Sequence, residues 1–334
     1  MKHISSKNIL IAFSFLLIFS CKKEEKKIDN PVPVPAPTPD PYTYNNELQS
    51  SKDISFATYV ISDLDMICAY ASQGISGDYE ATPSQSSSTT TIVSDTMVKQ
   101  IVYACNNSRC KDGRLRNGAA FFYYGYDPTN NYWAQPNANH YESYGFSASV
   151  YLDDFRVNDW KVQIFDPSQP AHIRNTLAGD LYNPALTNLT WEISGKFQFI
   201  NNLDPSRNLV WEGVIKKTLK NTSDTAVFAN KKAKVKWHLA KLDYIGSFSG
   251  MRSSSQTLYT YKIDSNTPLY RDMTCSYAPQ GATDVTEFHP FVFGKSVFTI
   301  GDYHPRTIDY GPTLNCDNKV NISFKDESHT EELD

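Results

Sequence analysis

Apolar and polar residues alternate from Thr190 to Phe199, and this pattern constrains the fold more than any other in the chain. Every second side chain is apolar, as Trp191, Ile193, Phe197 and Phe199 show, and Glu192, Lys196 and Gln198 stand between them. A period of two indicates a strand with one buried and one wet face, and such strands are typical of antiparallel sheets. The 21 Tyr, 18 Phe and 5 Trp also favour strands. The sequence therefore predicts a mainly β protein.

Further candidate strands succeed one another up to residue 324. In chain order they are 98–104, 119–126, 144–152, 155–165, 190–199, 235–239, 258–263, 269–277, 291–300, 307–310 and 320–324. Pro167, Pro170 and Pro184 interrupt the series and mark a boundary at residues 166–187. About 290 residues are available for folding, close to the size at which one core divides. We expect an antiparallel β-sandwich or jelly-roll-like head of two abutting β units, residues 45–166 and 187–325.

One segment has the helical period instead. Its apolar residues are spaced by three and four positions: Phe56, Val60, Leu64, Ile67, Cys68 and Ala71. Gly74 and Gly77 follow and are expected to end the helix. The pattern predicts one N-terminal α-helix over residues 55–72 that covers a face or an edge of the sheet. At the other end of the chain, the acidic residues 326–334 are expected to form a disordered tail.

The N-terminus is typical of an exported protein. Residues 1–20 carry Lys2 and Lys7, then an apolar run over residues 9–19 and the small Ser20. The run is too short to span a bilayer and is typical of a cleaved leader. Residues 18–21, Ile-Phe-Ser-Cys, resemble a bacterial lipobox, in which the cysteine thiol is acylated. We therefore expect a lipid anchor, such as palmitate, on Cys21.

Residues 21–44 are expected to form a tether. Lys23, Glu24 and Glu25 follow the cysteine directly and resemble the signal that moves Bacteroidota lipoproteins to the outer leaflet of the outer membrane; alternatively, they are only a hydrophilic spacer. Proline then alternates with small residues over residues 31–41, which predicts a semi-rigid polyproline II stalk of roughly 30 Å. The expected location is the outer membrane, with the head facing the cell exterior.

Charge argues against one class of partner. The chain carries a net charge of −4, and removal of the leader with Lys2 and Lys7 makes it −6. A protein that binds nucleic acid through its phosphates should instead have a basic excess. We therefore expect no nucleic-acid partner.

Five cysteines remain besides Cys21, and export permits them to pair. We predict one disulfide between Cys105 and Cys110 and one between Cys275 and Cys316, although sequence alone does not fix connectivity. Cys105 and Cys110 do not have zinc-ligand spacing, and no second ligand pair lies nearby. No metal and no cofactor is expected.

Residues 110–118 form the pattern Cys-x-Asp-Gly-x-x-Arg-x-Gly before an aromatic strand. The pattern resembles a family of Bacteroidota outer-membrane lipoproteins, and residues 157–162, 289–291, 306–311 and 316–318 agree with it in order. The resemblance covers most of residues 55–325 but brings no activity with it. The extra Cys105 and the aromatic loop 127–144 depart from the pattern of this family. Any partner of this chain is therefore expected to differ from the partners of the related lipoproteins.

Physically, this motif is a turn. Asp112 and Gly113 favour a tight turn, Gly118 permits close approach of another backbone, and a buried Arg116 would need a carboxylate. Asp309, Gly311 and Asp317 repeat the scheme near the C-terminus. We expect both motifs to pin structural corners rather than to bind a ligand.

Motifs typical of catalysis do not occur in the chain. Asp153 and Asp154 could serve a glycoside hydrolase only if the fold places two carboxylates across a cleft. The loop with Tyr132, Trp133, Tyr141 and Tyr144 suits stacking on sugars or anchoring a partner, or it caps the core. Seven lysines between Lys216 and Lys236 suggest a basic face.

Two short patterns, Asp95-Thr96-Met97 and Asp224-Thr225-Ala226, resemble Bacteroidota O-glycosylation sites. Taken together, the sequence predicts a surface-exposed, non-enzymatic outer-membrane lipoprotein that acts as a binding or accessory subunit of a barrel or export complex. A glycan-binding lipoprotein and a glycoside hydrolase with unrecognised carboxylates are the alternatives.

Overall fold

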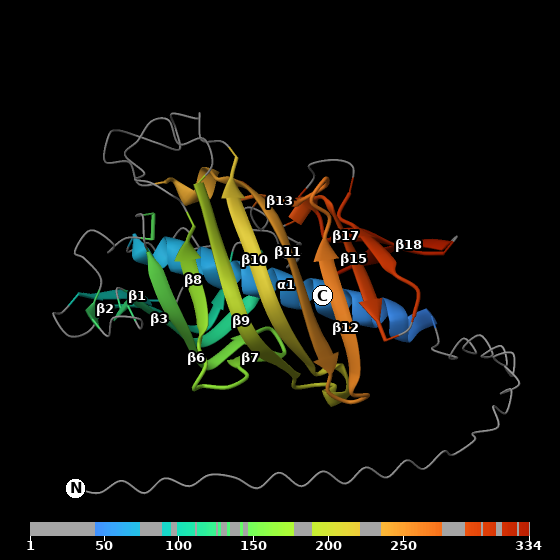
Figure 1. Cartoon of the computed structure of the whole chain (residues 1–334), viewed down its shortest axis with the longest axis horizontal. Helices are drawn as coiled ribbons and strands as arrows, with labels where there is room; N and C mark the ends of the chain where they lie inside the picture. Colours follow the sequence, from blue (N-terminus) through green and yellow to red (C-terminus); the bar gives the residue numbers. More distant parts are fainter. Residues whose placement is uncertain are drawn as a thin grey trace, which may run out of the picture. The chain divides into compact units, whose positions relative to one another are not determined.

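A long helix, α1 (Tyr44–Ser72), lies behind a broad antiparallel sheet and crosses its central strands (Figure 1). The computed structural model describes residues 44–73, 89–94, 99–110, 112–124, 126–127, 132–133, 141–142, 146–176, 189–220, 235–275, 291–301, 303–311, 316–325 and 327–333. The predicted leader and nearly all of the predicted tether lie outside these residues. The described residues fall within one unit.

The strands of the first half are β1 (Thr89–Ser94), β2 (Lys99–Arg109), β3 (Leu115–Tyr124), β4 (Tyr126–Asp127), β5 (Tyr132–Trp133), β6 (Ser147–Val157), β7 (Trp160–Ile164) and β8 (Ala171–Asn175). Those of the second half are β9 (Leu189–Asn201), β10 (Leu209–Leu219), β11 (Lys241–Arg252), β12 (Thr257–Ile263), β13 (Leu269–Asp272), β14 (Phe291–Phe293), β15 (Lys295–Ile300), β16 (Arg306–Asp309), β17 (Lys319–Phe324) and β18 (Glu327–Glu332). Two short 3₁₀ turns, η2 (Pro205–Arg207) and η3 (Trp237–Leu239), complete the order.

Among the described residues, sixteen strands form one sheet with the order β1-β2-β3-β6-β7-β9-β10-β11-β12-β15-β16-β17-β18. Off this path, β8 pairs with β6 and β9, β13 pairs with β11 and β14, and β4 and β5 form a separate pair. Neighbouring strands are antiparallel throughout, as in β9–β10 and β10–β11. The predicted mainly β, antiparallel, sandwich-like class with one N-terminal helix is confirmed.

The boundary predicted at residues 166–187 does not divide the sheet. β7, before this boundary, and β8, inside it, both pair with β9, after it. Pro167 and Pro170 lie in the turn between β7 and β8, and the sheet continues on both sides of that turn. The two predicted β units are therefore parts of one continuous sheet.

Helix α1 is enclosed rather than laid on one face. Each residue from Ser50 to Ser72 is buried except the half-buried Lys52. The stretch Leu48–Ser72 is long and apolar enough to cross a membrane, yet here it is packed inside the unit. A helix that is apolar all round is typical of such a position. The predicted apolar stripe is therefore only part of a helix that is buried on all sides.

Three carboxylates accompany the apolar residues of α1 into the core. Asp53 pairs with Arg207, Asp63 with cations of β3 and β13, and Asp65 with a lysine of β10. Phe56 also stacks on Trp160 of β7, at 5.5 Å between ring centres. The helix thus contacts strands from both halves of the sheet and holds them around it.

Candidate functional site

Some of the predicted functional residues lie outside the described residues. These are Cys21, Lys23, Glu24, Glu25, Tyr144, Thr96 and Thr225. Tyr132 and Trp133 lie on β5, and only their backbone is described. Lipidation, the export signal, O-glycosylation and sugar stacking by these rings therefore stay predictions.

The Cys-x-Asp-Gly-x-x-Arg-x-Gly motif forms a buried ionic corner beneath α1. Arg116, at the start of β3, donates to both carboxylate oxygens of Asp112 at 2.9 Å and to Asp63 of α1 at 2.6 Å. The Asp63 carboxylate also accepts a bond from Arg271 of β13 at 2.9 Å. Tyr59 completes the cluster through hydrogen bonds with Asp112 and Arg116. Arg116 has the carboxylate that a buried guanidinium requires.

The charges in this corner shift the pKa of Asp112. Burial alone would raise the pKa of this carboxyl, but the hydrogen bonds and charge of Arg116, with the charge of Arg114, lower it well below its usual range. The carboxylate is therefore held ionised inside the protein. The Asp112 carboxylate is buried and hydrogen-bonded by Tyr59 and Arg116, so it is not available to a ligand.

Two glycines of the motif permit the corner. Gly113 has φ +82° in the turn, and Gly118 has φ +88° at a bulge between β3 and β6. A Cβ at Gly118 would lie 2.3 Å from the carbonyl oxygen of Asp154. Only glycine fits such an approach.

The C-terminal counterpart also forms turns. Asp309 accepts a bond from the backbone N–H of Gly311 and pairs with Lys295 at 2.9 Å. Asp317 accepts a bond from the backbone N–H of Lys319, at the start of β17. Both carboxylates shape chain reversals, consistent with the structural interpretation.

The cysteines pair only in part as predicted. Cys275 and Cys316 form a disulfide across 41 residues. The prediction of a Cys105–Cys110 disulfide is wrong: neither cysteine is disulfide-bonded, and both thiols are buried, as is that of Cys68. Cys105 lies on β2 and bonds the carbonyl of Gly118, whereas Cys110 lies near the hydroxyl of Tyr103. The two thiols thus have separate surroundings.

The binding role predicted for Tyr141 is also wrong, because its side chain is fully buried. Its ring stacks on Trp191 at 5.3 Å, and its hydroxyl bonds Asp65 of α1. The alternative, that these aromatics cap the core, holds for Tyr141. Lys217 lies beside it in the core rather than on the predicted basic face, since it takes an inward position of β10.

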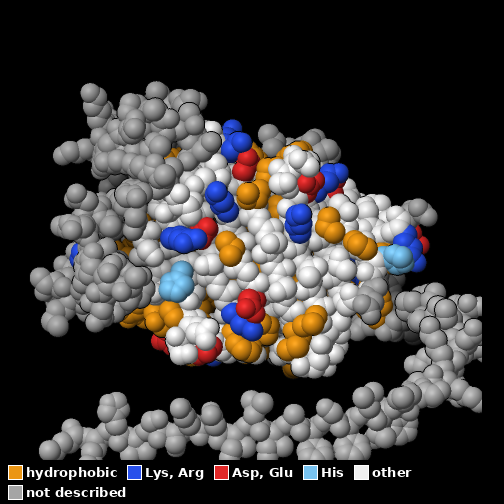
Figure 2. All heavy atoms as spheres, in the orientation of Figure 1, with side chains coloured by type: hydrophobic (Ala, Val, Ile, Leu, Met, Phe, Trp, Pro, Cys, Tyr) orange, Lys and Arg blue, Asp and Glu red, His pale blue; other side chains and the backbone are white. Residues whose placement is uncertain are grey.

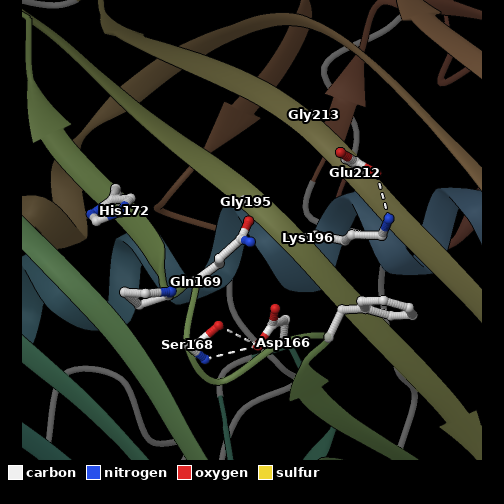
Figure 3. A pocket seen from close by; sticks show the side chains of 10 residues that line it. Asp166, Ser168, Gln169, His172, Gly195, Lys196, Glu212 and Gly213 are labelled. Atoms are coloured by element: carbon white, nitrogen blue, oxygen red, sulfur yellow. Dashed lines mark hydrogen bonds and ion pairs between the residues drawn. The ribbon is translucent and has the colours of Figure 1, made fainter.

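A depression of about 770 Å³ opens on the outer side of the sheet. The loop between β7 and β8 forms one rim, and β9 and β10 form the floor (Figure 3). Its lining residues are Phe165, Asp166, Ser168, Gln169, Pro170, His172, Gly195, Lys196, Glu212 and Gly213. The outer face around it mixes basic and acidic side chains with scattered apolar ones (Figure 2).

Glycines shape the floor of this depression. Gly195 and Gly213 face each other across β9 and β10. A Cβ at Gly195 would lie 2.5 Å from that of Ala171, and one at Gly213 would lie 2.4 Å from that of Phe248. The missing side chains let the neighbouring strands approach closely and bend the sheet. This depression was not predicted from the sequence; Gly195, Gly213 and Pro170 are the residues that could have indicated it.

The side chains of the depression combine a ring with polar groups. Lys196 pairs with Glu212 at 2.9 Å and lies 4.5 Å over the half-exposed ring of Phe165. Asp166 accepts bonds from the N–H and hydroxyl of Ser168, which lower its pKa. Half-burial and the nearby Arg174 lower the pKa of His172, so its imidazole is neutral at pH 7.

These positions do not suit glycoside hydrolysis. A general acid needs a raised pKa, whereas hydrogen bonds lower that of Asp166, and Glu212 is occupied by Lys196. Asp153 and Asp154 are exposed, and Asp154 pairs with Arg156 and Lys161. Within the described residues, no group of three His, Cys, Asp or Glu is placed to hold a metal ion.

Comparison with models of known families, with curated proteins and with solved structures found no match to this chain.

Proposed function

We propose that the protein is a lipid-anchored, surface-exposed binding protein of the outer membrane, whose head holds a partner protein of a barrel or export complex. The lipobox at Cys21, the charged residues behind it and the proline-rich stalk support the anchor. The likeness of its Cys-x-Asp-Gly motif to Bacteroidota outer-membrane lipoproteins supports the same location. The proposal assigns no catalytic step to the head.

The depression on the outer face carries the binding role. The depression exposes the Phe165 ring, two carboxylates, the Gln169 amide and the neutral His172 imidazole to solvent. The ionic groups around α1 are instead buried and paired with one another. Protein interfaces often centre on an exposed aromatic ring that is flanked by polar groups able to form hydrogen bonds with the partner. The depression is therefore the place where a partner would dock.

Glycan binding at the same place is the second candidate. One face of the Phe165 ring lies under Lys196, so a sugar could stack on the other. Gln169, His172 and the two carboxylates offer donors and acceptors for sugar hydroxyls. The aromatic pair Tyr132 and Trp133 remains a further proposed contact for a glycan.

The test compares wild-type protein with the double variant Phe165→Ala/Glu212→Gln. Crosslinking and capture from native membranes should recover a barrel or export protein with the wild type, and the double variant should lose it by at least about tenfold. Leu258→Ala is the matched control, because Leu258 is 68% exposed but lies outside the depression. Equal capture by all three proteins would contradict the site.

A glycan array separates the two candidates. If a sugar is the ligand, wild type should bind a defined set of glycans, and Phe165→Ala should weaken this binding by about tenfold while Leu258→Ala does not. Trp133→Ala tests the second aromatic contact. Capture of a protein partner without array binding would reject the glycan candidate.

A further inference from the structure

Lys217 occupies an unusual position for a lysine. It points inward from β10, and its side chain is 1% exposed. Three rings surround its ammonium, those of Tyr141, Trp191 and Trp237, with ring centres 4.9, 5.2 and 5.0 Å from Nζ. The Sδ of Met66 lies 3.3 Å away. The amine is thus enclosed by apolar and aromatic groups.

One carboxylate reaches this enclosure. Asp65, on α1, is 2% exposed, and its Oδ2 lies 2.6 Å from Nζ of Lys217. The Tyr141 hydroxyl joins the two groups: it accepts a bond from Nζ at 2.5 Å and donates one to Oδ1 of Asp65 at 2.5 Å. The amine, the carboxyl and a hydroxyl able to move a proton between them therefore form a closed triangle.

We propose that Lys217 and Asp65 become joined by an isopeptide bond that ties α1 to β10. A proton first passes from Nζ to the carboxylate, which leaves a neutral amine and a carboxylic acid. The amine lone pair attacks Cγ, so that a C–N bond forms and a C–O bond breaks. The departing oxygen takes the second proton from nitrogen and leaves as water. An ammonium and a carboxylate thus yield an amide and water, with no oxidant or reductant.

The surroundings favour this reaction over a lasting ion pair. Burying two charges carries a desolvation penalty for each of them, and the amide removes both charges. Burial lowers the pKa of Lys217 against the opposing effect of Asp65, and Arg271 lowers it further. The neutral amine, which is the nucleophile, is therefore more accessible than in water. Tyr141 is placed to take a proton from nitrogen and to give one to the departing oxygen.

The chain contains matched pairs that should not react. Lys220 and Asp243 lie 2.8 Å apart, and Lys295 and Asp309 lie 2.9 Å apart. Their lysine side chains are about half exposed, so water keeps the amines charged. The nitrogen–oxygen distances of the three pairs are similar, but the Lys217–Asp65 pair is buried and is bridged by the Tyr141 hydroxyl.

Peptide mass spectrometry of the tryptic digest of the full-length protein tests the proposal. If Lys217 is unlinked, trypsin cleaves after both Lys216 and Lys217 and releases residues 53–99 as a separate peptide; a linked Lys217 resists cleavage, so the peptides 53–99 and 217–220 stay joined. We expect one joined species, lighter than the sum of the two peptides by one water molecule, and no joined species from the two exposed pairs. Recovery of residues 53–99 only as an unlinked peptide, with cleavage after Lys217, would overturn the proposal, and this readout is independent of any lipid or glycan elsewhere.

Two variants refine the test. Lys217→Arg keeps the charge but lacks the amine and should abolish the joined peptide; the same species in this variant would show that another lysine is responsible. Tyr141→Phe keeps the ring and removes the hydroxyl, so the joined fraction should rise about 10²-fold more slowly after synthesis. An unchanged rate would refute the role given to Tyr141.

Discussion

At the scale of single residues, the buried ionic corner at Asp112 was the part most open to prediction. The sequence indicated a turn at Asp112 and Gly113, and it required a carboxylate for Arg116 if that residue were buried. What it did not reveal was Asp63, which comes from α1, because no local spacing links the helix to β3. Tyr141 failed for the same reason: an aromatic residue among Asn and Pro looks exposed until the partner that buries it is known.

The Asp112 corner leads to a prediction about acid stability. The pKa of Asp112 is lowered in the folded protein, so the carboxyl holds its proton less tightly there than in the unfolded chain. Its stabilisation is therefore complete above its ordinary pKa of about 4 and is lost as pH falls toward the lowered folded value. We expect Asp112→Asn to reduce stability at pH 7 by about 3 to 5 kcal/mol and to flatten the acid limb of the stability curve.

Urea unfolding between pH 2 and pH 7 measures this effect. Asp317→Asn is the matched control, since Asp317 follows a cysteine in a similar turn but is exposed and should change little. Parallel pH profiles for wild type and Asp112→Asn would contradict the assignment of acid sensitivity to this carboxyl.

At the scale of elements, strands with clean alternation were predicted and those with interruptions were not. β9 and β12 agree with the pattern, whereas β10 and β11, which pair over their full lengths, were missed. Glycines such as Gly213 and Gly246 break their apolar face, and Lys217 puts a charge at an inward position. Conversely, residues 235–239 alternate but form the turn η3, where Trp237 anchors a reversal by packing on Trp191.

The acidic C-terminal segment is a second element that composition misjudged. Instead of a disordered tail, Glu327–Glu332 forms β18, which pairs with β17 at the edge of the sheet. An edge strand can carry charge on its exposed faces and is protected from pairing with other chains by it. Leu333 is buried beyond the strand, and its N–H bonds the carbonyl of Asn318. The apolar end holds the acidic strand in place.

The disulfide between Cys275 and Cys316 should stabilise the protein by an amount that grows with the logarithm of the length of the loop it closes. For a separation of 41 residues, the loss of loop entropy in the unfolded chain corresponds to about 4 kcal/mol. We expect the double variant Cys275→Ala/Cys316→Ala to unfold at a lower guanidinium concentration. Reductant should destabilise the wild type and leave the double variant unchanged. Cys105→Ala should retain the wild-type sensitivity to reductant, because Cys105 is not part of a disulfide.

At the scale of the whole molecule, composition was enough to predict a mainly β head, but not that its sheet is continuous. Prolines mark loops, and a loop between strands says nothing about which strands pair afterwards. β8, which lies within residues 166–187, pairs with both β6 and β9, and this pairing is therefore a property of the assembled fold. The burial of α1 on all sides could not be predicted either, because an apolar stripe on a helix does not indicate how far the sheet curves around it.

The proposed placement at the cell surface makes a prediction for the N-terminal segment. Cys21→Ser should release the protein from the membrane fraction and abolish labelling by a palmitate analogue, whereas Ser20→Ala, which keeps a small residue before the cysteine, should do neither. Replacing Lys23, Glu24 and Glu25 by alanine should keep the lipid but protect the head from protease added to intact cells. Alanine at Lys26 and Lys27 should leave the head sensitive to protease. If both variants are protected from protease equally, residues 23–25 act only as a hydrophilic spacer.

The enclosure of α1 also governs when the chain can finish folding. The helix is the first element to be synthesised, yet strands that contact it extend as far as β13, some two hundred residues later. Until they arrive, its apolar surface has no cover, and contacts so distant in sequence form slowly. The newly made polypeptide should therefore pass through a long-lived, aggregation-prone intermediate, and if it is exported as proposed, it should depend on a holdase chaperone while it crosses the envelope.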